Sequence, residues 1–245
     1  MTDLQHLPDN DFSRVLIVVA HPDDVEYGMS ACVAKWVEQG AEVAYLLLTA
    51  GEAGMQRPPA EVGPLRSAEQ REACRRVGVT DLTILDHPDG VLVYSLDLRR
   101  DVARKIREFR PDTVATSSFD VEAGWGLNQA DHRVAGLVAL DACRDADNPW
   151  VFPELKDEGL EKWAAERFIV FGDPKPSHAV VLDQKHVDAG IASLAAHEQY
   201  LADLPGHPSP DEFLTEGLSA QGEQAGVEYA ALFKLHQLGG AAAGE

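Results

Sequence analysis

One histidine and two aspartates stand together directly after an apolar segment near the amino terminus. Residues 15–20 read Val-Leu-Ile-Val-Val-Ala and are followed by His21, Pro22, Asp23 and Asp24. Such a run is typical of a strand buried on both faces of a parallel sheet, and the carboxyl ends of such strands form the ligand crevice. Buried charges are costly unless they are paired or bound to metal, and imidazole with carboxylate suits zinc and similar divalent ions.

A second interpretation of these four residues is a solvated turn between a strand and a helix. Pro22 would then set the backbone angle, and Asp24 would cap the following helix. The tetrapeptide alone leaves both interpretations open, so the choice depends on the rest of the chain.

Another histidine, His132, follows a later strand-like segment, within the sequence Leu-Asn-Gln-Ala-Asp-His-Arg at 127–133. It is predicted in the first turn of a helix. Parallel topology brings its loop and the His21 loop to one edge of the sheet, so His21, Asp24 and His132 can form a two-histidine, one-carboxylate site. Three protein ligands and an open position are typical of a catalytic zinc.

Asp23 would be adjacent to a ligand but free to accept a proton from water activated by the metal. The alternative for His132 is a first-turn histidine that is hydrogen-bonded to its neighbour Asp131. Taken alone, the pattern around His132 favours that alternative, and only its combination with the first motif favours a metal site.

The elements that must position these residues alternate between strand and helix over the first 120 residues. Strands are predicted at 14–20, 42–49, 82–85 and 112–116, helices at 25–39, 64–77 and 97–109, and a Gly- and Pro-rich loop at 50–63. This alternation predicts an α/β fold with βαβ units and a mostly parallel sheet flanked by helices.

The second half of the chain is less regular. A loop is predicted at 117–130, a helix at 131–144, strands at 168–172 and 179–182, a helix at 183–201, and patches of helix after Pro205. No linker interrupts the sequence, so residues 1–245 are expected to form a single domain, with core motifs in 14–145 and a less certain part at 146–245. The later histidines lack ligand-like spacing and are expected at the surface or on helix faces: His178, His186, His197 and His207.

Composition narrows the partners and the compartment. The chain has 245 residues and a formal charge of −20, which disfavours nucleic acid and anionic membranes as partners. Cys32, Cys74 and Cys143 are odd in number and form no CxxC pair, so a disulfide framework is not expected and a cytoplasmic location fits best. No stretch has the length of a membrane span. A homo-oligomer is left open.

Several segments, taken in order, resemble the LmbE/PIG-L family of zinc-dependent de-N-acetylases. The resemblance covers about the first 140 residues and is weak afterwards, where only 185–199 is similar. The matching segments are Ala-His-Pro-Asp-Asp at 20–24 with Glu26 and Gly28, Thr-Ala-Gly-Glu-Ala-Gly at 49–54, Arg66-x-x-Glu69-x-x-x-Ala73, Asp89-Gly90 and Asp131-His132-Arg133.

The resemblance implies a Rossmann-like fold and hydrolysis of an N-acyl group, often on an N-acetylglucosamine derivative. By position, it implies that His21, Asp24 and His132 bind Zn²⁺, one ion per chain, and that Asp23 is the general base. Asp131, in the third motif, is placed among the catalytic residues.

The same resemblance places Glu52, Arg66 and Asp89 where the family contacts substrate. Each has a plainer alternative. Glu52 can be a loop carboxylate, Arg66 can pair with Glu69 along one helix face, and Asp89 with Gly90 makes a good turn by itself.

One position departs from the family pattern, which usually reads His-Pro-Asp-His. Here the segment is Gln129-Ala130-Asp131-His132, so Gln129 stands where the family has its first histidine. An amide donates a hydrogen bond but carries no titratable proton. Gln129 is therefore expected to support an oxyanion and not to act as a general acid.

The sequence thus predicts a zinc amidohydrolase acting on a small N-acyl amino sugar or its conjugate. Two alternatives stay open: an amidase that cleaves a thiol or other conjugate, and a non-catalytic protein that retains metal, which Gln129 motivates. No Walker A, GxSxG or GxGxxG motif is present, so the alternating pattern does not imply a nucleotide cofactor.

Overall fold

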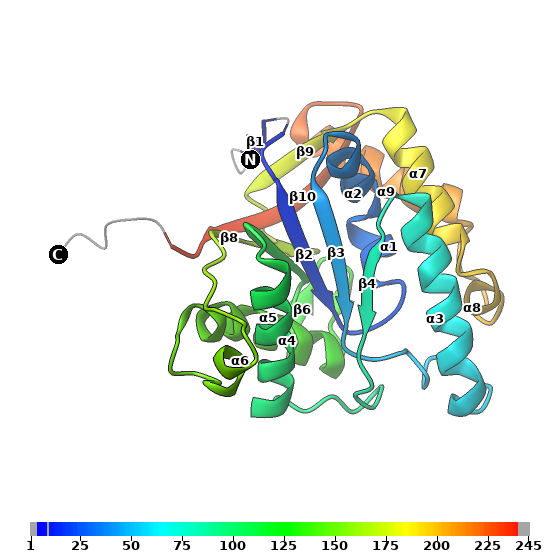
Figure 1. Ribbon diagram of the computed structural model, residues 1–245. Helices are drawn as coiled ribbons and strands as arrows, with labels where there is room; N and C mark the ends of the chain where they lie inside the picture. The colour runs from blue at the N-terminus through cyan, green and yellow to red at the C-terminus, as the bar shows by residue number, and fades with distance from the viewer. Residues whose placement is uncertain (1–3, 9, 240–245) are drawn as a thin grey trace.

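An eight-stranded sheet forms the centre of the computed structural model, which describes residues 4–8 and 10–239 (Figure 1). The strand order is β1-β9-β10-β8-β5-β2-β3-β4. The parallel part consists of β2 (Arg14–Val19), β3 (Glu42–Leu47), β4 (Asp81–Ile84), β5 (Thr113–Ser117) and β8 (Arg167–Phe171). The predicted α/β fold with a mostly parallel sheet is confirmed.

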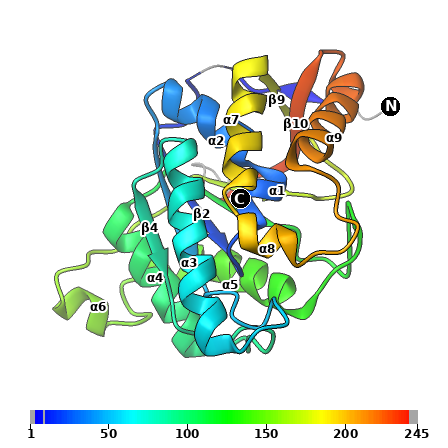
Figure 2. The ribbon, with the colours of Figure 1, turned by 90° about the vertical axis from the view of Figure 1, so that its right-hand side faces the viewer.

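Strand β2 contributes to both faces of the sheet because successive side chains alternate. Val15, Ile17 and Val19 belong to one apolar cluster, and Leu16 and Val18 belong to the other. The first face is covered by α1 (Asp24–Gly28), α2 (Ser30–Glu38), α3 (Pro59–Arg76), α7 (Gln184–Ala195) and α9 (Pro210–Ala225), and the second by α4 (Leu96–Phe109), α5 (Ala130–Asp147) and α6 (Glu154–Asp157). Figure 2 shows α2, α3 and α7 side by side on their face.

Three helices differ from the expected bounds. The helix predicted at 25–39 is divided at Met29 into α1 and α2. Helix α3 begins at Pro59 and not at 64, because Pro59 already occupies the first-turn position that proline favours. The helix predicted at 183–201 is interrupted after Ala195, and α8 (Glu198–Ala202) follows the break.

The expectation of helical patches after Pro205 is wrong for the last part of the chain. Strand β10 (Tyr229–Gln237) lies between β8 and β9 (His178–Leu182) and is antiparallel to both. Its residues Ala231 and Phe233 pack into the same cluster as Val15, so burial favours a strand there. Two further short pairings were not predicted: β1 (Gln5–His6) beside β9, and the hairpin of β6 (Glu122–Ala123) and β7 (Gly126–Leu127).

Strands from both halves of the sequence share this sheet, which supports the assignment of residues 1–245 to one domain. That assignment stays a prediction, and its residues 1–3, 9 and 240–245 lie outside the described part. None of the helices in the described ranges combines the length and apolar character needed to cross a membrane.

Candidate active site

The two histidine motifs meet at the carboxyl edge of the sheet. His21 and Asp24 lie between β2 and α1, and His132 lies in the first turn of α5, beyond β5. Asp24 is between the two rings: its Oδ1 is 3.0 Å from Nε2 of His132, and its Oδ2 is 3.6 Å from Nδ1 of His21. The predicted three residues are therefore brought together by segments more than 100 positions apart.

The hydrogen bonds of His21 fix which of its nitrogens carries a proton. Nε2 lies 3.0 Å from Oδ1 of Asp89 and 3.4 Å from Oδ2 of Asp131, so the Nε2–H group donates to these carboxylates. When the ring is neutral, the lone pair of Nδ1 therefore faces Asp24. A histidine held in this way by an outer carboxylate is typical of metal ligands.

His132 is oriented by Asn128. The Asn128 amide nitrogen donates to the backbone oxygens of Ser118 and Asp120, so its Oδ1 must be the atom 3.1 Å from Nδ1 of His132. Nδ1 therefore carries the proton and donates it to Oδ1. The other nitrogen, Nε2, then has the lone pair, and it lies 3.0 Å from Oδ1 of Asp24 and 2.9 Å from the amide nitrogen of Gln129.

These contacts leave two imidazole lone pairs and a carboxylate facing one another, which a cation between them would stabilise. One ligand atom each from His21, Asp24 and His132 lies within 4.8 Å of the others. His21, Asp89 and Asp131 are also mutually close, but those two carboxylates already accept backbone N–H groups from the loops after β3 and β4. A divalent metal site is thus possible at the first group.

The cluster favours positive charge, and without a metal ion a second proton on His21 supplies that charge. Burial by itself raises the pKa of Asp24, but His132 and His21 beside it hold that pKa well below its ordinary range. Burial lowers the pKa of His21, yet Asp24 and the hydrogen bonds to Asp131 and Asp89 raise it well above its ordinary value. The carboxylates outnumber the imidazoles, so the site attracts positive charge.

Asp23 is held in a strained conformation beside this cluster. Its φ is 85°, in the left-handed region that non-glycine residues rarely adopt. Its N–H donates to Oε1 of Gln70 at 2.9 Å, and its Oδ2 accepts from Nη2 of Arg66 at 2.9 Å. Burial raises the pKa of Asp23, and the Arg66 charge partly offsets that effect. The carboxylate expected to be free is therefore anchored by α3.

Arg66 is buried and serves several partners at once. Besides Asp23, its guanidinium donates to the carbonyls of Pro22 and Gly51, and it lies 3.9 Å from the centre of the Tyr200 ring. The alternative in which Arg66 pairs with Glu69 is wrong. Oε1 of Glu69 instead accepts the backbone N–H of Gln199, at 2.7 Å.

Glu52 and Asp89 tie the loops after β3 and β4 to each other. Oε1 of Glu52 accepts the backbone N–H of Asp89 at 2.9 Å, and Oδ2 of Asp89 accepts the N–H of Ala53 at 2.8 Å. Gly90 follows with a φ of 81°, as a turn requires. Glu52, Arg66 and Asp89 thus all have partners within the protein, and contact of these side chains with substrate stays a prediction.

The side chains of Gln129 and Asp131, both at the start of α5, differ in exposure and in partners. Gln129 is the exposed residue before the helix, and its amide nitrogen lies 2.9 Å from Nε2 of His132. Asp131 is buried and accepts the N–H groups of Gly90 and Leu92, at 2.7 and 3.1 Å. The alternative that paired Asp131 with His132 is therefore wrong.

Sequence reasoning gave no role to Gln70, Asn128 and His197. Gln70 is four residues after Arg66 within α3, so helical spacing is a signal for it, whereas Asn128 precedes α5 and has no such signal. The expectation that His197 lies on a surface or helix face is wrong: it has no exposed area and its Nε2 is 3.6 Å from Oε2 of an equally buried Glu26. The break between α7 and α8 turns this ring inward.

A cavity of about 680 Å³ adjoins the cluster, and Asp24 and His132 form part of its wall. Trp125, from the β6–β7 hairpin, lies edge-on to His132 with ring centres 6.0 Å apart. The rest of the wall comes mainly from residues after 170, including Phe171 and Phe213. The cluster therefore opens onto space that a substrate can enter.

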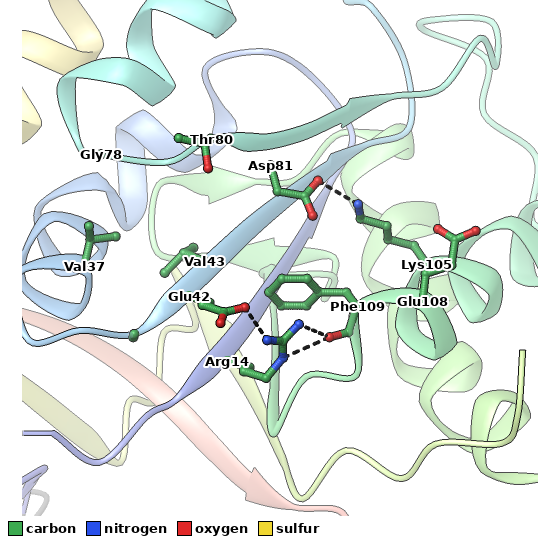
Figure 3. Close-up of a pocket in the computed structure, with 11 residues that line it drawn as sticks. Arg14, Val37, Glu42, Val43, Gly78, Thr80, Asp81, Lys105, Glu108 and Phe109 are labelled. Atoms are coloured by element: carbon green, nitrogen blue, oxygen red, sulfur yellow. Dashed lines mark hydrogen bonds and ion pairs between the residues drawn. The ribbon is translucent and has the colours of Figure 1, made fainter.

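A second hollow, of about 520 Å³, lies at the opposite edge of the sheet, where β2, β3 and β4 begin (Figure 3). Four of its charged side chains form pairs: Arg14 with Glu42, and Lys105 with Asp81 at 2.7 Å. It contains none of the residues predicted to act in chemistry, so the carboxyl edge is the candidate site.

Comparison with known proteins gives matches over the same region. The profile of the family described as "PIG-L: GlcNAc-PI de-N-acetylase" matches residues 16–143. A diacetylchitobiose deacetylase from Thermococcus kodakarensis is 31% identical over 196 residues, which cover 78% of this chain and 71% of that protein. A 1D-myo-inositol 2-acetamido-2-deoxy-alpha-D-glucopyranoside deacetylase from Streptomyces avermitilis is 31% identical over 180 residues, 62% of this chain and 59% of that one. The structure of an N,N'-diacetylchitobiose deacetylase from Pyrococcus horikoshii has a TM-score of 0.81 at 24% identity, over 94% of this chain and 85% of that chain.

Proposed function

The chain belongs to the PIG-L family of de-N-acetylases, and on that premise we propose that it hydrolyses the N-acetyl group of an amino sugar or amino sugar conjugate. It is an enzyme of the N-deacetylase class of amidohydrolases. The observation that carries the proposal is the convergence of His21, Asp24 and His132 beside the buried carboxylate of Asp23.

His21, Asp24 and His132 would hold one divalent metal ion, and zinc is the ion we propose. Two imidazoles and a carboxylate with an open position are the donor set of hydrolytic zinc sites. A metal bound there would polarise the acetyl carbonyl and increase the acidity of water. Asp89 and Asp131 would keep His21 in the required tautomer, and Asn128 would do the same for His132.

Side chains of the protein carry out the proton transfers and stabilise the oxyanion. Asp23 accepts a proton from the attacking water as the new C–O bond forms, and the amide N–H of Gln129 donates to the developing oxyanion. When the C–N bond breaks, Asp23 returns the proton to the leaving nitrogen, giving acetate and a free amine. Arg66 and Gln70 keep Asp23 in place through both steps.

The test is acetate release from N-acetylglucosamine and diacetylchitobiose by the purified, zinc-loaded protein, with and without a chelator. We expect acetate to form, the chelator to abolish its release and the Asp23→Asn variant to slow it by about 10²–10⁴. If a thiol conjugate is cleaved while no N-acetyl sugar releases acetate, the amidase alternative replaces this proposal. Retained metal without hydrolysis of either kind would favour the binding-protein alternative.

Two further expectations from the sequence remain predictions, and association into a homo-oligomer stays open. The expectations are a cytoplasmic location and the absence of a nucleic-acid partner. The first rests on the three cysteines, all of which are buried and unpaired, and the second on the charge of −20.

A further inference from the structure

The cavity beside the metal cluster is larger than an acetamido group requires. Its volume of about 680 Å³ falls within the range of roughly 300–1,000 Å³ that is typical of sites for drug-sized ligands. Asp24 and His132 form part of its wall, so a group bound in the cavity lies next to the place proposed for the acetyl group. Much of the remaining wall lies beyond the segment 16–143 that matches the family.

Two aromatic side chains in the wall of this cavity remain exposed. Trp125 is 53% exposed and lies against Gly172, whose φ of 69° and missing side chain leave room for the indole. Phe213 is 37% exposed and packs edge-on against Tyr27, with ring centres 5.2 Å apart. Exposed aromatic rings around a cavity are typical of ligand sites, because a bound apolar group removes them from water.

One polar group of the wall also lacks a partner. Ser117, at the end of β5, is 2% exposed, and its hydroxyl has no hydrogen-bond partner within the described residues. A buried hydroxyl without a partner is unfavourable, and a ligand group in the cavity would supply one. This hydroxyl is therefore a second, independent indication that the cavity binds a ligand.

The charges around the cavity select against an anionic ligand. Its wall includes the carboxylates of Asp24 and Asp173, and among the described residues that form it there is no lysine or arginine. Lys234 lies outside the wall and pairs with Asp173, at 3.5 Å. The other polar groups on the α9 side are the neutral amides of Gln221 and Gln224. Apart from the metal ion proposed at Asp24 and His132, a phosphate placed here would lose water without gaining a cation.

We propose that this cavity binds the aglycone of the amino sugar, and that the preferred aglycone is uncharged and carries an aromatic or alkyl group. This inference rests on the proposed function for the identity of the reacting group. It goes further in naming the chemical class of the group attached to the sugar.

The experiment compares N-acetylglucosamine, its phenyl glycoside and its 1-phosphate, which share one acetamido group. We expect kcat/KM for acetate release to be at least about tenfold higher for the phenyl glycoside than for the free sugar, through KM, because the ring buries apolar area. The 1-phosphate should be poorer than the free sugar. A 1-phosphate that equals or exceeds the phenyl glycoside would overturn the inference.

Variants with matched controls locate the preference in the cavity. Phe213→Ala should reduce the ratio of phenyl glycoside to free sugar, whereas Trp150→Ala, which removes an aromatic ring that is 85% exposed elsewhere, should not change it. Gln224→Lys should improve the 1-phosphate severalfold, whereas Gln184→Lys, outside the cavity, should not. An unchanged ratio in Phe213→Ala contradicts the assignment.

Calorimetric binding of the phenyl glycoside and the free sugar separates this inference from the proposed function. If no substrate releases acetate but the phenyl glycoside still binds about tenfold more tightly, the function proposal fails and the cavity assignment stands. If all three substrates release acetate with equal kcat/KM, the function stands and the cavity assignment fails.

Discussion

Replacing Asp89 by asparagine distinguishes two roles for this residue. By the resemblance, Asp89 contacts substrate, whereas in the structure its carboxylate is 3.0 Å from Nε2 of His21 and accepts the N–H of Ala53. Burial raises the pKa of Asp89, but the hydrogen bond and charge of His21 outweigh that and lower it. The carboxylate is therefore ionised where it meets His21. We expect Asp89→Asn to weaken metal binding.

The size of the effect follows from the bond that changes. A hydrogen bond to a charged group contributes about 1.5–3 kcal/mol, and a neutral one about 0.5–1.5 kcal/mol. Losing the charge but keeping an acceptor thus costs about 1–1.5 kcal/mol, or roughly tenfold in the metal dissociation constant. Asp131, 3.4 Å from the same nitrogen, still accepts from His21 and limits the loss. Outer carboxylates of metal sites typically contribute about 10–100-fold.

The assay is competition for zinc between the protein and a chromophoric chelator at pH 7. Asp86→Asn is the control, because it makes the same chemical change on an exposed side chain in the same loop. A tenfold weaker zinc affinity in Asp89→Asn alone supports the positioning role. Unchanged zinc affinity together with a raised KM would refute this reasoning and assign Asp89 to the substrate.

Three other substitutions test the remaining roles. His132→Ala should lose most of the bound metal in elemental analysis, and a full metal content would exclude His132 as a ligand. Asp23→Asn should keep its metal and fold but lose about 10²–10⁴ in kcat, as removal of a general base does; near-native turnover would mean that another residue is the base. Gln129→Ala should lower kcat with little change in KM, because an oxyanion contact acts in the transition state, and Gln129→His should be tolerated. An unchanged kcat in Gln129→Ala would make the residue a bystander.

The parallel half of the fold was predictable because its signals are local. Each strand of 14–20, 42–49 and 112–116 is an apolar run followed by a helical pattern, and burial on both faces leaves such runs little alternative. Strand β10 was missed because its pairing is not local. Nothing near Tyr229 in the sequence indicates that β8 and β9 leave a gap for an antiparallel strand.

The site was predictable to the level of which segments meet, and less so in how side chains are held. Strand ends gave the common location of His21, Asp24 and His132. The hydrogen-bond partners of the two histidines are Asp89, Asp131 and Asn128. Which side chains these are depends on how the loops that carry them orient their side chains, and the sequence does not show this. Asn128 illustrates this, since its role follows only once its amide is seen to donate to Ser118 and Asp120.

Helix α3 explains why the His-Pro-Asp-Asp segment alone does not determine the site. Arg66 binds the side chain of Asp23, and Gln70, one turn later, binds its backbone N–H, so both hold the residue at a φ of 85°. Gln70 is oriented in turn, because its amide nitrogen donates to the buried carboxylate of Glu26 at 3.1 Å. A left-handed aspartate costs about 1–3 kcal/mol and persists only where its surroundings impose it. The position of the proposed base therefore depends on the hydrogen bonds that Arg66 and Gln70 of α3 make to the start of α1.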